Sequence, residues 1–79
     1  MPTVVRVGPH RFFFFSREGN EPPHIHVESA GKYAKYWIRP AAYERSTGFR
    51  AHELAEVRRI IVEIEDLIQE KWNEHFGNP

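Results

Sequence analysis

Two histidines, His24 and His26, stand two residues apart after a pair of prolines in the stretch EPPHIHV, residues 21–27. Side chains alternate between the two faces of a strand, so a strand here presents both imidazoles on one side, with Cα atoms about 6.5–7 Å apart. Imidazoles titrate near neutral pH, so such a pair can exchange the roles of acid and base. The spacing therefore predicts a pair able to transfer protons or bind a ligand.

The residues that follow predict the partners of this pair. Ala30 and Gly31 fit the centre of a tight hairpin turn. Counting outward from that turn places Lys35 opposite His26, and Trp37 opposite the other histidine. One face of the hairpin, which we expect a helix to cover, then holds Ile25, Val27, Ala34, Tyr36 and Ile38. The other face, which we expect to be open, holds His24, His26, Glu28, Tyr33, Lys35, Trp37 and Arg39.

An open face of this kind suits metal-independent cleavage of RNA. The predicted catalytic residues are His24 and His26 as the acid–base pair and Lys35 as the cation that stabilises a developing phosphorane charge. The predicted nucleic-acid-binding residues are Tyr33 and Trp37, which stack on bases, and Arg39, which contacts phosphate together with Lys35.

Two other interpretations of the histidine pair stay open. Two strand histidines can ligate zinc, but a stable site takes three or four ligands. Glu28, His10 and Glu21 are the candidates for a third ligand if the fold brings one of them near. Two histidines alone do not define a site, so we assign no metal and no cofactor. In the remaining interpretation, the imidazoles only decorate a solvated face beside Trp37.

These side chains need a sheet to position them. Short apolar or alternating segments predict strands over residues 3–7, 11–16, 24–28 and 33–39, whereas residues 41–49 read as a loop or short turn of helix. The aromatic run Phe12–Phe15 is predicted to place two rings in the core and to leave the other two as an exposed aromatic patch.

The period of the apolar residues changes in the last third of the chain. From residue 51 to residue 75 they recur at spacings of three and four: Leu54, Val57, Ile61, Ile64, Ile68 and Trp72. This pattern predicts one long amphipathic helix. We therefore expect a single α+β domain over residues 1–79, with a three- or four-stranded antiparallel sheet packed against that helix. A helix this long can overhang the sheet, so its end near Trp72 and Phe76 is a predicted homodimer contact.

Composition and charge narrow the class of protein. The 79 residues carry no net charge and no cysteine, which excludes disulfides and thiolate zinc sites. Residues 1–50 hold eight Lys/Arg against four Asp/Glu, and residues 51–79 hold three against seven, which predicts a basic layer and an acidic one. There is no apolar N-terminal run and no stretch of about 20 apolar residues, so we expect a cytoplasmic protein without a membrane segment.

Several segments together resemble the bacterial family called domain of unknown function 4160. They are residues 13–16 (FFFS), 21–27 (EPPHIHV), 34–38 (AKYWI), 48–49 (GF) and 71–74 (KWNE). The resemblance implies a small stand-alone prokaryotic protein. Family members are often encoded beside a second small protein in pairs that look like toxin–antitoxin modules, with this family on the toxin side, and some are labelled as transcription regulators.

The resemblance implies an antitoxin-like partner protein, but it transfers no catalytic residue. Our leading hypothesis is a toxin–antitoxin component that acts on RNA through the open sheet face. The alternatives are a non-enzymatic interaction or regulatory module and a histidine-based metal-binding protein. Whether the chain is an enzyme is left undecided by the sequence.

Overall fold

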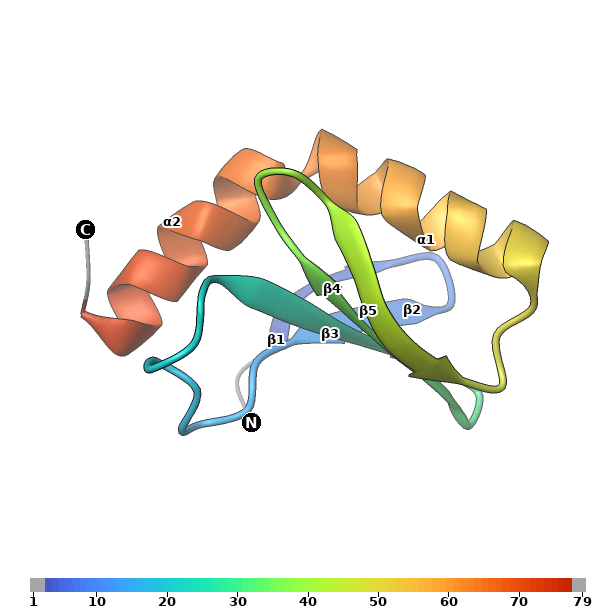
Figure 1. Ribbon diagram of the computed structural model, residues 1–79, viewed down its shortest axis with the longest axis horizontal. Helices are drawn as coiled ribbons and strands as arrows, with labels where there is room; N and C mark the ends of the chain where they lie inside the picture. Colours follow the sequence, from blue (N-terminus) through green and yellow to red (C-terminus); the bar gives the residue numbers. More distant parts are fainter. Residues whose placement is uncertain (1–2, 78–79) are drawn as a thin grey trace.

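The computed structural model describes residues 3–77, which form an antiparallel sheet followed by helices (Figure 1). The strands are β1 (Thr3–Val7), β2 (His10–Phe13), β3 (His24–Ser29), β4 (Lys32–Trp37) and β5 (Ala42–Thr47), and the helices are α1 (Ala51–Glu63) and α2 (Glu65–Phe76). The sheet has five strands in the order β1-β2-β3-β4-β5, so each strand pairs with its neighbour in the chain. The predicted α+β class, with an antiparallel sheet before a helical layer, is confirmed.

The β3–β4 hairpin has the predicted register. Ala30 and Gly31 have φ angles of 48° and 82°, the left-handed conformation that a two-residue hairpin turn of this type requires. His26 pairs with Lys35, and Trp37 pairs with the histidine at position 24. The turn fixes the register, and the register fixes which side chains share a face.

The fifth strand, β5, lies where a loop or a short turn of helix was predicted. Its sequence, AYERST, has no alternation of apolar and polar residues, because one edge of the strand is unpaired and most of its side chains are exposed. Glu44 and Arg45 are charged and exposed, as is common on edge strands that avoid pairing with other chains. Strand formation here follows from pairing with β4, which the local sequence does not reveal.

The predicted single helix is two helices that meet at Ile64. This residue has φ −109° and ψ 17°, and its N–H donates to the carbonyls of Ile60 and Ile61. The two helices lie at an angle and arch over one side of the sheet (Figure 1). The apolar stripe continues through the break, because both helices bury the same side against the sheet, so the sequence carries no signal for it.

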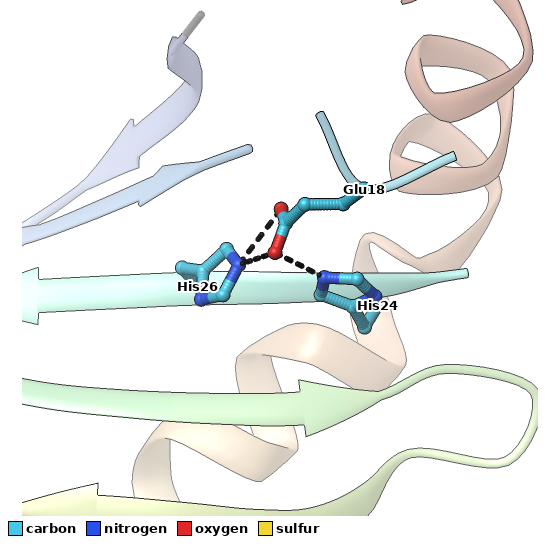
Figure 2. A group of neighbouring side chains, drawn as sticks. All are labelled: Glu18, His24 and His26. Atoms are coloured by element: carbon cyan, nitrogen blue, oxygen red, sulfur yellow. Dashed lines mark hydrogen bonds and ion pairs between the residues drawn. The ribbon is translucent and has the colours of Figure 1, made fainter. Parts of the chain in front are cut away.

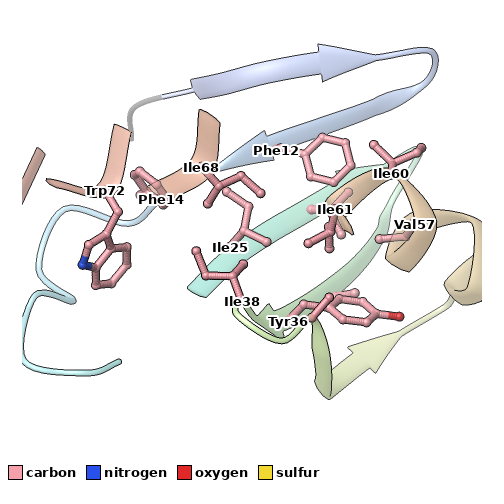
Figure 3. Close-up of a cluster of buried hydrophobic side chains, with 13 residues drawn as sticks. Phe12, Phe14, Ile25, Tyr36, Ile38, Val57, Ile60, Ile61, Ile68 and Trp72 are labelled. Atoms are coloured by element: carbon pink, nitrogen blue, oxygen red, sulfur yellow. The ribbon is translucent and has the colours of Figure 1, made fainter. Parts of the chain in front are cut away.

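The core lies between this side of the sheet and the helices (Figure 3). Its sheet residues include the whole predicted apolar face of the hairpin, Ile25, Val27, Ala34, Tyr36 and Ile38, together with Phe12, Phe14 and Ala41; its helix residues are Val57, Ile60, Ile61, Ile68 and Trp72. Two rings of the aromatic run are thus in the core, as predicted. The predicted exposed patch is wrong for Phe13, which is 3% exposed, while Phe15 is 37% exposed.

The end of α2 is packed within the chain. The Trp72 ring is buried and lies 5.3 Å from Phe14 and 4.2 Å from Phe76, centroid to centroid. The indole predicted as a contact for a second copy is therefore not on the surface, and the homodimer itself stays a prediction. None of the helices within residues 3–77 has the length and apolar character needed to span a bilayer.

Candidate metal centre

The outer face of the sheet, opposite the helices, is covered where an open surface was predicted. Residues 14–23, here called the 14–23 loop, leave β2 and cross this face before β3 begins. His24 and His26 do share one side of β3, as predicted, but they are 0% and 1% exposed. The predicted strands over residues 11–16 and 24–28 leave residues 17–23 as the connection between them, but the sequence did not reveal that this connection folds back over β3.

Glu18 of the 14–23 loop reaches both imidazoles (Figure 2). Its Oε1 atom lies 2.9 Å from Nε2 of His24 and 2.8 Å from Nε2 of His26. Its Oε2 atom lies 2.9 Å from the same nitrogen of His26. The three ligand atoms are all within 4.8 Å of one another, and the Glu18 side chain is 12% exposed. A carboxylate and two imidazoles thus converge in a nearly closed space.

The His24 ring is oriented by the loop backbone. Its Nδ1 atom lies 2.9 Å from the carbonyl oxygen of Pro22 and can only donate to that oxygen, so Nδ1 carries a proton. In the neutral ring Nε2 therefore presents a lone pair toward the carboxylate. Within residues 3–77, Nε2 is buried without a hydrogen-bond partner, although Glu18 is close, because the contact is not aligned for one. The contact with Glu18 therefore does not satisfy the hydrogen-bonding capacity of Nε2 of His24.

The His26 ring is held on all sides. Its Nδ1 atom lies 2.7 Å from the hydroxyl oxygen of Tyr33. The ring stacks on Phe13 with centroids 5.5 Å apart and meets Phe15 edge-on at 4.5 Å. Arg45 donates to the Tyr33 oxygen at 3.4 Å, which leaves the hydroxyl proton free to point at the imidazole. Both histidines therefore direct Nε2 at Glu18 while an oxygen atom holds Nδ1.

Burial and hydrogen bonding shift the pKa values of two of the three groups. Burial raises the pKa of the Glu18 carboxyl, but contacts with the two imidazoles and the N–H of Phe15 outweigh it, so the pKa lies below its ordinary value. Burial lowers the pKa of His26, and the nearby carboxylate only partly opposes this. Near neutral pH the carboxyl is ionised and His26 is neutral, which are the forms that bind a metal ion.

The other predicted site residues are divided between two places. Lys35 is buried beside the pair, where its Nζ atom donates to Glu21 at 2.9 Å and lies 4.7 Å from the centre of the Trp37 ring. Tyr33 and Trp37 are on the same face as the histidines, as predicted, but they are half-buried where an open face was expected. The hydrogen bond from Lys35 is the main cause of a lowered pKa at Glu21.

Arg39 is not on the outer face. It follows the end of β4, has φ 56°, and its guanidinium donates to Asp66 at 2.6 Å, while its backbone N–H donates to Glu65 at 3.0 Å. The prediction that it lines the same surface as the histidines is wrong, because β4 ends at Trp37 and the alternation ends with it. Arg39 joins the β4–β5 turn to the start of α2.

None of the three proposed third ligands occupies the position that Glu18 takes. His10 is buried 6.2 Å from the Phe49 ring, on the helix side. Glu28 is ion-paired with Arg11. Glu21 lies 3.9 Å from the other nitrogen, Nδ1, of His24.

Glu18 itself was missed, because an acidic residue in a turn rich in Gly, Asn and Pro is unremarkable. The available signal is the length of the 14–23 loop, well beyond the two to five residues usual in a hairpin. A connection of that length needs a surface on which to pack.

Two imidazole nitrogens and a carboxylate form a donor set that suits zinc and similar divalent transition metals. Bonds of about 2.0–2.1 Å around a tetrahedral ion would separate neighbouring ligand atoms by about 3.3 Å. Glu18 would have to withdraw by about half an ångström from both nitrogens to admit the ion, a shift small enough for a side chain that a surface loop carries.

The family comparison agrees with the resemblance carried by the sequence segments. The profile described as Domain of unknown function (DUF4160) matches residues 10–73. The chain belongs to the DUF4160 family. The matched range includes the 14–23 loop and all three residues of the candidate centre. No curated protein and no solved structure matches the chain.

Proposed function

We propose that this DUF4160 domain is a metal-binding module in which Glu18, His24 and His26 hold one divalent ion of the zinc class. The observation that carries the proposal is the Nε2 atom of His24, fully buried, aimed into the cluster and without a hydrogen-bond partner in the described chain. A buried polar atom left unsatisfied costs about 1–3 kcal/mol. A metal ion between the imidazole and the carboxylate removes that cost and uses the lone pair directly.

The surroundings of the two rings support the same function. Metal-binding histidines commonly donate the other ring N–H to an oxygen atom, which fixes the tautomer and the ring orientation. Here the carbonyl of Pro22 and the hydroxyl of Tyr33 are placed to accept from Nδ1 of the two rings. If a metal replaces the proton on Nε2 of His26, Nδ1 becomes the donor and Tyr33 the acceptor, so the Tyr33 side chain only has to turn its hydroxyl proton away.

The closure of the site favours a binding role over turnover. Three protein ligands leave a coordination position for water. The ligands are nearly inaccessible, however, and the surface cavities between β1 and α2, at the β1–β2 edge and beside β5 are not lined by them. An ion here would fasten the 14–23 loop to β3.

The direct test is metal content and cobalt spectroscopy on the purified full chain. We expect one Zn²⁺ per chain after dialysis, and a Co²⁺ complex with visible absorption bands typical of a four- or five-coordinate ion. Glu18→Gln and His24→Gln should abolish both signals. Glu28→Gln and His52→Gln are the matched controls, because both residues lie outside the cluster. A wild-type chain that retains no metal, or variants that bind as well as wild type, would refute the proposal.

Action on RNA as part of a toxin–antitoxin pair is a second proposal, and it rests mainly on the family resemblance. One observation supports it: Tyr33 and Trp37 are partly accessible on the outer face, with Arg45 and Lys35 over their rings. The acid–base roles proposed for His24 and His26 are weakened by burial beneath Glu18.

The test of this second proposal is expression in bacteria with and without the neighbouring small protein. Growth arrest with RNA cleavage that Tyr33→Ala and Trp37→Ala abolish would support action on RNA. Arrest without cleavage would instead favour the interaction module and its partner protein.

A further inference from the structure

The candidate metal centre touches the C-terminal helix. The ring of His24 lies 5.0 Å from the ring of Trp72, centroid to centroid, at an interplanar angle of 61°. Trp72 is one of two residues through which α2 enters the core, the other being Ile68. A ligand of the candidate ion is therefore a direct packing partner of the main anchor of α2.

The loop that carries Glu18 makes a second contact with α2. Gly19 lies so close to Phe76 that a Cβ atom at position 19 would be 3.0 Å from Cδ1 of that ring. The Phe76 ring in turn packs on Phe14, at the start of the same loop, with centroids 5.8 Å apart. The last turn of α2 and the 14–23 loop lie next to each other (Figure 1) and are in close contact at Gly19 and Phe76.

α2 has few other anchors. It is separated from α1 by the break at Ile64, and its first turn is joined to the sheet through Arg39, in an ion pair with the exposed Asp66. Toward its C-terminal end, the aromatic contacts of Trp72 and Phe76 with the sheet side are made with Phe14 and His24. The aromatic part of the docking of this half of α2 therefore depends on residues 14–24, beside the aliphatic core that Ile68 and Trp72 join.

We propose that an ion held by Glu18, His24 and His26 locks the C-terminal half of α2 onto the 14–23 loop, so that metal binding and α2 docking are coupled. The inference rests on the proposed metal-binding function. Suppose that the ion binds only when the loop is closed. It then lowers the equilibrium constant of every opening motion that would release the ion by the factor 1 + [metal]/Kd, which is about 100-fold at a metal concentration of 100 times Kd. Coupling is reciprocal, so a well-docked α2 in turn raises metal affinity.

Hydrogen–deuterium exchange of the full chain, metal-free and loaded with Zn²⁺, tests the coupling. We expect amides of residues 66–76 to exchange faster than those of α1 in the metal-free chain, and to slow by about 100-fold at zinc concentrations near 100 times Kd. Amides of β5, which the site does not touch, should change little. Bound metal is checked independently by the Co²⁺ spectrum.

A variant separates coupling from binding. Gly19→Val places a branched side chain against Phe76 and leaves the three ligands intact, so it should keep the Co²⁺ spectrum while the zinc-induced slowing at α2 falls by about 10-fold or more. Asn20→Val, at the exposed neighbouring position, is the control and should behave as wild type.

Metal binding without slower exchange at α2 in the wild-type chain would overturn the inference and leave the metal site standing. Equal slowing of α1 and α2 would also overturn it, because the ion would then stabilise the domain only as a whole. A chain that binds no metal would overturn both proposals, whatever the Gly19→Val variant does.

Discussion

The Nε2 atom of His24 lies 2.9 Å from the Oε1 atom of Glu18, yet it has no hydrogen-bond partner within residues 3–77. In the neutral tautomer that carries its proton on Nδ1, which the carbonyl of Pro22 selects, both atoms carry lone pairs, so their contact is unfavourable without a cation between them. A proton on Nε2 would also make the contact favourable, as an ion pair between imidazolium and carboxylate, so a proton competes with a metal ion for this position. A metal ion takes the same position once the carboxylate and the two nitrogens, which lie within 4.8 Å of one another, adjust to the spacing of a coordination shell.

The first prediction concerns thermal stability. A ligand that binds only the folded chain adds about 2.7 kcal/mol at 100 times Kd, which corresponds to a rise in Tm of roughly 10–20 °C for a domain of this size. We expect Zn²⁺ to produce such a rise in calorimetry and EDTA to reverse it. Glu18→Gln should remove the response, and Glu28→Gln should keep it. An identical shift in both variants would show that zinc acts elsewhere.

The sequence predicts the hairpin that carries the two histidines in detail, for a local physical reason. A two-residue turn at Ala30 and Gly31 determines every cross-strand pair of β3 and β4, and alternation then assigns each side chain to a face. The core face of this hairpin was predicted correctly for the same reason. These inferences need only short-range geometry and one periodic pattern.

The features that the sequence does not reveal depend on contacts between distant segments. Residues 42–47 form β5 because they pair with β4 through backbone hydrogen bonds. The helix break at Ile64 leaves no mark in the sequence, because the apolar residues keep their spacing across it. The accessible face was predicted by assuming that only the helix covers the sheet. The 14–23 loop covers the other face, and it also supplies Glu18, the ligand that completes the candidate centre.

A second prediction isolates the orientation of His26. Tyr33→Phe removes the hydroxyl that lies 2.7 Å from Nδ1 of this ring while keeping the aromatic stack. Loss of such an outer hydrogen bond typically lowers metal affinity about 10- to 100-fold. Competition with a chromophoric chelator measures the change. Tyr43→Phe, which removes an exposed hydroxyl bonded to Ser46, is the control. Equal affinities in wild type and Tyr33→Phe would contradict the assigned role.

A third prediction concerns the pH dependence of the metal-free chain. The pKa of His26 in the folded chain lies below its ordinary value of 6.5, chiefly because of burial, so the unfolded chain takes up this proton first as the pH falls. The contribution of His26 to the free energy of unfolding is therefore fully present above pH 6.5. It is lost as the pH falls from there toward the lower pKa of the folded chain. Glu18 acts in the same direction at lower pH, since its folded pKa lies below 4.5.

Urea unfolding of the metal-free chain between about pH 8 and pH 4 checks this sign. The urea concentration at the midpoint of unfolding should decrease on acidification, and the decrease should begin near the ordinary pKa of an imidazole. His26→Gln should lack the part of the decline that begins there and keep the part caused by carboxylates. A midpoint that rises as the pH falls toward 5 would mean that His26 is stabilised as the cation, next to Glu18, and that the ring is not held ready for a metal.

A fourth prediction uses the two indoles as reporters of where the ion sits. The ring of His24 lies 5.6 Å from the ring of Trp37 and 5.0 Å from that of Trp72, so an ion bound to its Nε2 atom is near both. Cu²⁺ quenches tryptophan emission at such short range, and Zn²⁺ does not. We expect stoichiometric Cu²⁺ to quench the emission of the wild-type chain, and Zn²⁺ added first to prevent it.

Single-tryptophan variants then locate the ion relative to the two layers of the fold. Trp37→Phe leaves only the indole on α2, and Trp72→Phe leaves only the indole on β4, so quenching in both variants places the ion within short range of both α2 and β4, as expected for an ion bound to His24. Glu18→Gln in either background should abolish stoichiometric quenching. Quenching of Trp72 alone would move the ion to the neighbouring His75 on α2, away from Glu18, and would remove the basis for both the metal centre and its coupling to the helix.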